Sequence, residues 1–454
     1  MGVTEAGVAR AGASLTRYYD ELRQLFRSRS PTSELFAPAF ELPPLDDALG
    51  DYFSVAELRL TGIGAYRGRA LWLLDLAANP RTRTTKTFAS LTMVARAVEH
   101  TRRTGERVVL VTPTSGNKGT ALRDAVLRAY ETGVSAPDEL GIVTLNPAAS
   151  LGKLWHSPLA DDRDLRRRNP VLTYAGDDAA HVKTLAREAV ESAAADALRE
   201  RCTRLWYTLD LDNYRLPDAV RAFVEADVMP PADRPRVHAH AVSSAYGLLG
   251  YSLGWHWSND GHEREPHPWL FLVQHLATPD LVLHLAFGSF SRANLPPYRL
   301  DDATGLYVQT SDLRFPAATF ARDEAIDPTF YTREPPTAPL VGELVSAHGG
   351  GGIVVSLFEC LSRYGEARRL AELGGRGLPS DPRLLREWAL TMALVGVLEA
   401  ADRDLLPEGC EVVVHASGTY SALDFEPLDP RLTIPVGTAG DVRRAIVDAL
   451  PGPR

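Results

Sequence analysis

Residues 79–88 read NPRTRTTKTF, and residues 114–121 read TSGNKGTA. Apolar residues recur at helical spacing after Lys86, which predicts a helix that begins at this lysine. The apolar run 108–111 predicts a strand, and the polar turn at 115–117 then opens a second helix. A lysine amine forms an imine with a carbonyl group. A turn at a helix start offers backbone N–H groups to an anionic or phenolic oxygen. These stretches together predict a site in which a lysine holds an aldehyde cofactor.

Both motifs resemble those of threonine synthase and its relatives, the fold type II pyridoxal-phosphate enzymes that include the tryptophan synthase β subunit. Asn79-Pro80 and Thr84-Thr85-Lys86 look like the family motif N-P-T-G-S-F-K, and Ser115-Gly116-Asn117 looks like its S/T-G-N loop. The resemblance implies that Lys86 holds pyridoxal 5′-phosphate as an imine and that Asn117 contacts the ring hydroxyl of the cofactor. The chain departs from the family pattern around the lysine, because threonine precedes it and the usual Asp-Arg does not follow.

The family also has a phosphate-binding turn about 150 residues after its lysine. Residues 237–242 read as a strand, and the turn that follows begins 157 residues after Lys86. A strand, a turn of small residues and a helix N-terminus bind an anion through backbone N–H groups and the helix dipole. We therefore assign the phosphate to the following residues: Ser243, Ser244, Ala245, Tyr246 and Gly247.

Four consecutive glycines at 349–352 form a rival phosphate loop, but a lone glycine run is weak evidence. Ser356 and Glu359 lie three residues apart, which is the spacing of a capping box for a further helix. We interpret the glycine run as a flexible turn near the mouth of the active site.

A predicted strand at 411–415 ends just before Ser417. The resemblance implies that the Ser417 hydroxyl faces the pyridine nitrogen of the cofactor, where a serine tunes the ring without fully protonating it. A hydrolase that uses Ser417 with His415 is an alternative, although no G-x-S-x-G elbow surrounds this serine.

The composition is that of a globular enzyme. At 454 residues the chain is long enough for two domains. The net charge of −9 argues against a nucleic-acid partner. The three cysteines form no metal motif, and we expect no metal site and a reducing, cytoplasmic location. No run of 18 apolar residues is present, so we expect no membrane association.

Alternating strands and helices predict an α/β fold with parallel-type sheets, as in the two-domain fold type II enzymes. Residues 1–55 should form an N-terminal helical extension and linker. Residues 56–100 with 230–454 should form the large cofactor-binding domain, and 105–225 the smaller domain with the Asn loop. The proline-rich segment 289–340 is either surface elaboration or an active-site lid.

We predict a pyridoxal-phosphate-dependent lyase or transferase, similar to threonine synthase, that acts on a small amino-acid substrate. Lys86 would remove the α-proton, and loss of a β or γ substituent would lead to elimination or replacement. Tyr214 or Arg215 would reach the substrate carboxylate. We expect a homodimer, in amino acid metabolism or specialised biosynthesis. Two alternatives stay open, namely a non-catalytic scaffold of the same fold that binds a partner, and an amino-acid racemase.

Overall fold

The computed structural model describes residues 10–31, 34–259, 266–326 and 333–450. The chain forms two compact units. The large unit comprises Glu57–Ala78, Asp218–Asp424 and the N-terminal residues up to Ala13, and the small unit comprises Ser14–Ala56, Asn79–Pro217 and Phe425–Arg454. No described helix combines the length and the apolar character that a membrane span requires.

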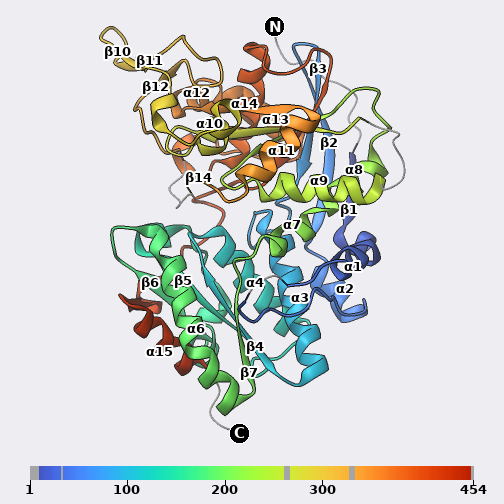
Figure 1. Cartoon of the computed structure of the whole chain (residues 1–454), viewed down its shortest axis with the longest axis vertical. Helices are drawn as coiled ribbons and strands as arrows, with labels where there is room; N and C mark the ends of the chain where they lie inside the picture. Colours follow the sequence, from blue (N-terminus) through green and yellow to red (C-terminus); the bar gives the residue numbers. More distant parts are fainter. Residues whose placement is uncertain (1–9, 32–33, 260–265, 327–332, 451–454) are drawn as a thin grey trace. The chain divides into compact units, whose positions relative to one another are not determined.

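The large unit contains a seven-stranded sheet in the order β1-β2-β3-β15-β8-β9-β13 (Figure 1). Its strands are β1 (Arg10–Ser14), β2 (Glu57–Tyr66), β3 (Arg69–Asp75), β8 (Val237–Ala241), β9 (Trp269–His275), β13 (Gly350–Val355) and β15 (Glu411–Ala416). The last five pair in parallel, whereas β2 pairs with β3 in the antiparallel sense. Val412, Val413 and Val414 of β15 are fully buried, as expected for a parallel strand covered on both faces.

Seven helices of the large unit matter below. They are α8 (Val220–Val228), α9 (Tyr246–Asn259), α10 (Asp280–Phe287), α11 (Ala338–His348), α12 (Leu357–Ser362), α13 (Tyr364–Leu373) and α14 (Ala389–Asp402). Apolar residues of α13 and α14 share one core with β3, β8, β9, β13 and β15. We call the edge at which the parallel strands end the carboxyl edge and the opposite one the amino edge.

The small unit contains a five-stranded parallel sheet in the order β17-β6-β5-β4-β7 (Figure 1). Its strands are β4 (Arg107–Pro113), β5 (Leu140–Pro147), β6 (Val171–Tyr174), β7 (Thr203–Tyr207) and β17 (Ile434–Val436). The main helices are α3 (Lys86–Thr104), α4 (Asn117–Glu131), α6 (Val182–Arg201) and α15 (Ala439–Ala449), of which α6 and α15 lie side by side. The predicted α/β class with mostly parallel sheets is thus confirmed.

The boundaries of the units differ from those expected. Residues 79–104 belong to the small unit together with the Asn loop, because α3 packs against α4. The last 30 residues, 425–454, also belong there, because β17 pairs with β6 and Leu428 N–H donates to the Leu154 carbonyl (2.8 Å). The small unit is therefore assembled from three separate stretches of the chain.

The N-terminal helix is shorter than the helical spacing of apolar residues suggested. Helix α1 spans Tyr19–Arg27, a second helix α2 spans Asp47–Phe53, and Arg10–Ser14 form β1 instead. The Ser14 side chain accepts from Thr16 N–H and so ends the strand. Residues 1–9 lie outside the described residues.

The glycine run is not a flexible turn at a site mouth, so that interpretation is wrong. Gly349 caps α11 with a φ of 97°, and the next three glycines begin β13, where Gly350 pairs with Leu270. A Cβ atom on Gly350 would lie 2.3 Å from the Leu270 carbonyl oxygen, so glycine is required by close backbone approach. The run also lies at the amino edge, whereas Ser243 and Ser417 follow strands at the carboxyl edge. The predicted capping box of Ser356 and Glu359 is present at the start of α12.

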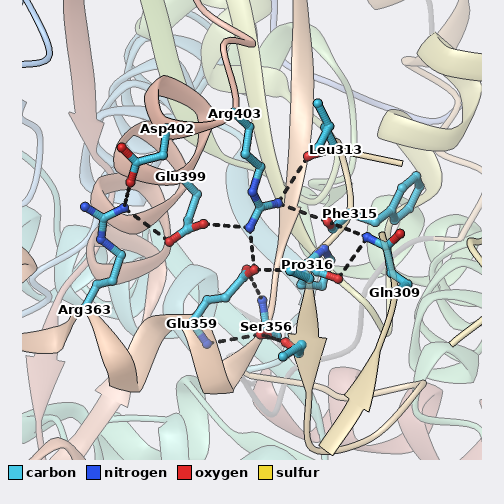
Figure 2. Close-up of polar contacts among 12 residues, drawn as sticks. Gln309, Leu313, Phe315, Pro316, Ser356, Glu359, Arg363, Glu399, Asp402 and Arg403 are labelled. Atoms are coloured by element: carbon cyan, nitrogen blue, oxygen red, sulfur yellow. Dashed lines mark hydrogen bonds and ion pairs between the residues drawn. The ribbon is translucent and has the colours of Figure 1, made fainter. Parts of the chain in front are cut away.

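The described part of the proline-rich segment is fastened to α12 and α14, as Figure 2 shows. It contains three short antiparallel strands, β10 (Arg299–Asp301), β11 (Leu306–Val308) and β12 (Ala318–Thr319). Glu359 accepts from Ala317 N–H (3.1 Å), and Arg403 donates to the Phe315 carbonyl (3.0 Å) and forms an ion pair with Glu359. This segment is therefore held in place by buried charges at the carboxyl end of β13.

Candidate functional site

The turn before Lys86 is held by a carboxylate of the neighbouring helix in the small unit. Asp124 of α4 accepts from the Asn79 side chain (2.8 Å) and forms an ion pair with Arg81 (2.7 Å). The Arg83 N–H donates to the Asn79 carbonyl (2.8 Å), and Arg83 adopts a left-handed φ of 44°. Helix α3 then begins at Lys86 itself. The Asn-Pro stretch therefore determines the position of Lys86 at the end of the turn and attaches this turn to α4, the helix that follows the Asn loop.

The Asn loop follows β4 at the carboxyl edge of the small sheet. The Thr114 hydroxyl accepts from the N–H groups of Gly116 (3.1 Å) and Gly119 (2.9 Å), which closes the turn ahead of α4. Gly116 has a φ of 132°, and a Cβ there would lie 2.8 Å from the Lys153 Cβ. Asn117 is the first residue of α4, where backbone N–H groups lack acceptors within the helix. The loop thus has the shape of an anion-binding helix start.

Lys86 lies at this same edge, because α3 runs back along the sheet before β4 begins. Its Nζ lies 5.8 Å from the centroid of the Tyr214 ring. Burial holds the pKa of Lys118 well below its usual value, and the positive charges of Lys183 and Lys86 lower it further. Burial also lowers the pKa of Lys183. Burial thus lowers the pKa of two amines near the Asn loop.

Every lysine of the chain lies at this edge of the small sheet. Of 49 lysine and arginine residues only four are lysines, at positions 86, 118, 153 and 183. Lys153 packs its Cβ against Gly116, and Lys118 interacts electrostatically with Lys86 and with Lys183. An arginine cannot be deprotonated in a protein, whereas a buried lysine can. The chain therefore places all of its lysine amines at one edge of one sheet.

The Ser243–Gly247 turn occupies the expected place in the large unit. It follows β8 at the carboxyl edge, and α9 begins at Tyr246. Ala245 has a left-handed φ of 54°, and the Ser244 carbonyl accepts from the Thr337 hydroxyl (2.8 Å). The first N–H groups of α9 point out of the helix without an acceptor inside it, which suits an anion.

A buried arginine lies directly behind this turn. The fully buried guanidinium of Arg221, on α8, lies so close to Gly247 that a Cβ there would be 2.5 Å from its Nη1. Arg221 forms an ion pair with Asp218 (2.9 Å) and contacts His415 Nδ1 at 3.0 Å. Gly247 is therefore required by packing, and a permanent positive charge supports the first turn of α9.

Arg221 begins a directional hydrogen-bond chain. A guanidinium only donates, so His415 Nδ1 accepts. Burial, and then the charge of Arg221, hold the pKa of His415 well below its usual value, so this imidazole is neutral and its Nε2–H donates to His238 Nδ1 (3.0 Å). His238 Nε2 faces Glu225 at 3.3 Å. Although burial opposes ionisation, His238 and Arg236 keep the pKa of Glu225 below its usual value. The chain therefore ends on a carboxylate.

Ser417 lies two residues after His415, the second member of this chain. Its N–H donates to the His415 carbonyl (3.0 Å), and its side chain is 8% exposed. Because Arg221 and His238 occupy both ring nitrogens of His415, that ring cannot serve as the base of a serine hydrolase. The geometry therefore does not support the hydrolase alternative.

Residues 10–450 match the model of a family of unknown function, DUF6002. The chain belongs to DUF6002. Comparison with curated proteins gives no match.

Solved structures show which fold this DUF6002 chain has. Threonine synthase from yeast is 12% identical with a TM-score of 0.54, over 96% of this chain and 89% of the yeast chain. Threonine synthase from Brucella melitensis, solved with pyridoxal phosphate bound, is 14% identical with a TM-score of 0.52, over 89% and 83% of the two chains. The DUF6002 chain thus has the fold of the fold type II pyridoxal-phosphate enzymes.

The expected site residues of the DUF6002 chain fall into two groups, one in each unit. The small unit brings Lys86, Ser115, Gly116 and Asn117 to the carboxyl edge of its sheet. The large unit brings Ser243–Gly247 and Ser417 to the ends of the adjacent strands β8 and β15. Sequence reasoning missed Arg221, Lys118 and the histidine chain. Two signals were available, namely the scarcity of lysine and the alternation of His238 and His240 along one strand.

Proposed function

We propose that this protein is a pyridoxal-phosphate-dependent enzyme that catalyses β- or γ-elimination or replacement on an amino acid. One observation carries the proposal: Lys86 is the first residue of α3 and lies at the sheet edge where Ser115–Asn117 open α4. The confinement of all lysines to this edge supports it, because only an amine that gives up its proton can act as nucleophile or base.

The side chains present fit this cofactor by the chemistry of their donors. Arg221 and the α9 N–H groups supply the fixed charge and donors that a phosphate needs. The chain also has an amine for the aldehyde carbon of the cofactor, an amide for its ring hydroxyl and a hydroxyl for its ring nitrogen. The residues that would hold the aldehyde carbon, ring hydroxyl, phosphate and ring nitrogen are, in that order, Lys86, Asn117, Ser243–Gly247 and Ser417.

When bound, pyridoxal phosphate draws electrons from the α-carbon of an amino acid and so weakens its Cα–H bond. Lys86 is then the base that takes the α-proton at its Nζ. The Tyr214 ring lies beneath this amine and favours its protonated form through a cation–π contact at 5.8 Å. Lys118, whose pKa burial holds well below its usual value, is a second amine at the same sheet edge.

Lys118 also favours a second candidate, amino-acid racemisation. A racemase needs two groups that move protons, and Lys118 is a second amine whose pKa is well below its usual value. The two candidates differ in the fate of the side chain, because racemisation leaves it intact whereas elimination releases its leaving group.

The test is α-deuterium exchange in deuterated water with O-activated serine and homoserine derivatives. We expect exchange with release of the side-chain leaving group, and borohydride treatment followed by peptide mapping should mark Lys86 among the four lysines. Exchange without side-chain loss would favour the racemase. A protein that binds the cofactor but exchanges no amino acid would favour the scaffold, and a label on Lys118, Lys153 or Lys183 would refute the assignment of Lys86.

A further inference from the structure

Three histidines meet at the amino edge of the large sheet, away from Ser243 and Ser417. His256 lies in the last turn of α9, His348 is the last residue of α11, and His267 lies two residues before β9. Each offers one ring nitrogen, and these three atoms all lie within 4.8 Å of one another. The rings of His267 and His348 stack with their centroids 3.7 Å apart.

The hydrogen bond of His267 decides which of its nitrogens is available. Its Nδ1 lies 2.8 Å from the Pro268 carbonyl, which only accepts, so Nδ1 carries the proton. Nε2 then presents a lone pair. Among the described residues it has no hydrogen-bond partner, and it is shielded from solvent. Histidines that bind metals are oriented in this way, with the second ring nitrogen donating to a backbone carbonyl.

The surrounding backbone favours a cation at this place. Helices α9 and α11 both direct their C-terminal ends toward the three histidines, and the helix dipole is negative there. Within the described part of the chain, none of the three side chains forms an ion pair. Among the residues that the structure describes, no side chain therefore brings a positive charge to this buried lone pair and these two helix C-termini.

We propose that His256, His267 and His348 bind one divalent transition-metal ion of the zinc class, with water as the fourth ligand. Imidazole nitrogens suit such ions, and three histidines with one open position are an established ligand set. Tetrahedral Zn–N bonds place nitrogens about 3.4 Å apart. Closing the triad to that distance requires rotation of two exposed rings, those of His256 and His348, and the His348 ring must leave its stack on His267.

This metal would fasten the helix that starts at the phosphate turn. Helix α9 begins directly after Ala245 and ends at the triad, so the ion would tie its far end to β9 and α11. The inference does not depend on the proposed catalytic function, because it concerns residues at the opposite edge of the sheet.

The test uses the full chain, purified without a histidine tag and freed of metal with a chelator. Titration with Zn²⁺ by calorimetry should give one equivalent, and Co²⁺ should give the visible absorption of a tetrahedral site. We expect His267→Gln to abolish this binding, and His256→Ala and His348→Ala to weaken it at least about 10-fold. His181→Ala, in the small unit, is the matched control and should bind as the wild type does.

The variant His256→Ala keeps the test decisive even if His267→Gln unfolds, because His256 is exposed. Failure of the wild type to bind zinc with defined stoichiometry would overturn the proposal. So would zinc binding that persists unchanged in His256→Ala and His348→Ala, since that result would identify adventitious surface binding.

Discussion

The two units each present a turn that follows a parallel strand and opens a helix, but the basic residues beside the two turns are of different types. Around Asn117 the chain places lysines, and burial lowers the pKa of Lys118. Behind Gly247 it places Arg221, which is fully buried and paired with Asp218. A lysine changes its charge during a reaction, whereas an arginine keeps it. Under the proposed function, the small unit would supply proton transfer and the large unit would supply a fixed charge for an anion.

The largest effect is expected at Lys86. Lys86→Ala should lower α-deuterium exchange by at least about 10³-fold, because the base is lost. Lys86→Arg keeps a positive charge but cannot give up its proton, so it should be equally inactive. Exchange assays and circular dichroism of both variants provide the measurement. Substantial exchange in Lys86→Arg would contradict the contrast drawn between lysine and arginine, since a positive charge alone would then be sufficient for exchange.

A smaller effect is expected behind the phosphate turn. Arg221→Met should weaken binding of pyridoxal phosphate roughly 10- to 100-fold, because a charge-assisted interaction contributes about 1.5–3 kcal/mol. Arg221→Lys should retain most of the affinity, which is the reverse of the result expected at Lys86. Fluorescence titration with the cofactor measures both, and thermal unfolding without cofactor separates lost binding from lost folding. Equal affinity in all three proteins would remove Arg221 from the phosphate site.

Ser417 should matter less. Ser417→Ala should bind the cofactor as the wild type does and slow exchange about 5-fold, as expected for the loss of one neutral hydrogen bond. The exchange rate under saturating cofactor is the measurement. Ser421→Ala, four residues further on, is a buried control that should leave the rate unchanged. A normal rate in Ser417→Ala would place this hydroxyl outside the site.

A buried carboxyl group at the carboxyl end of β13, that of Glu359, should affect stability. Burial raises the pKa of Glu359 to about 7, although Arg403 opposes the rise. Between pH 4.5 and 7 the folded state therefore holds a proton that the unfolded state has lost, and the free energy of unfolding falls as pH rises, by at most about 3 kcal/mol.

The substitution Glu359→Gln removes this titration. Denaturant unfolding of both proteins from pH 5 to pH 8 should show that the wild type loses stability relative to the variant as pH rises to 7, with no further change above. A constant difference across the range would mean that Arg403 keeps Glu359 ionised throughout. Cofactor affinity should be the same in both proteins.

Some elements were predictable because short-range interactions determine them. The helix start at Lys86, the turn between β8 and α9, and the capping box of Ser356 each depend on residues a few positions apart. The same holds for the alternation of strands and helices that predicts an α/β fold. Where hydrogen bonds join residues close in the chain, the sequence alone is enough to predict the helix start, turn or cap that they form.

Only the tertiary structure decided the rest, because it depends on residues far apart in the chain. The sequence of the glycine run predicts a turn. In the structure the run pairs with β9, and the backbone of β9 leaves no room for a side chain at Gly350. Arg221 and His415 are 194 positions apart, yet their contact helps to hold the charged Arg221 side chain behind Gly247. The triad of His256, His267 and His348 likewise arises where two helix ends and a strand start converge. Spacing along the sequence carries no record of such contacts, since they form only when the sheet assembles.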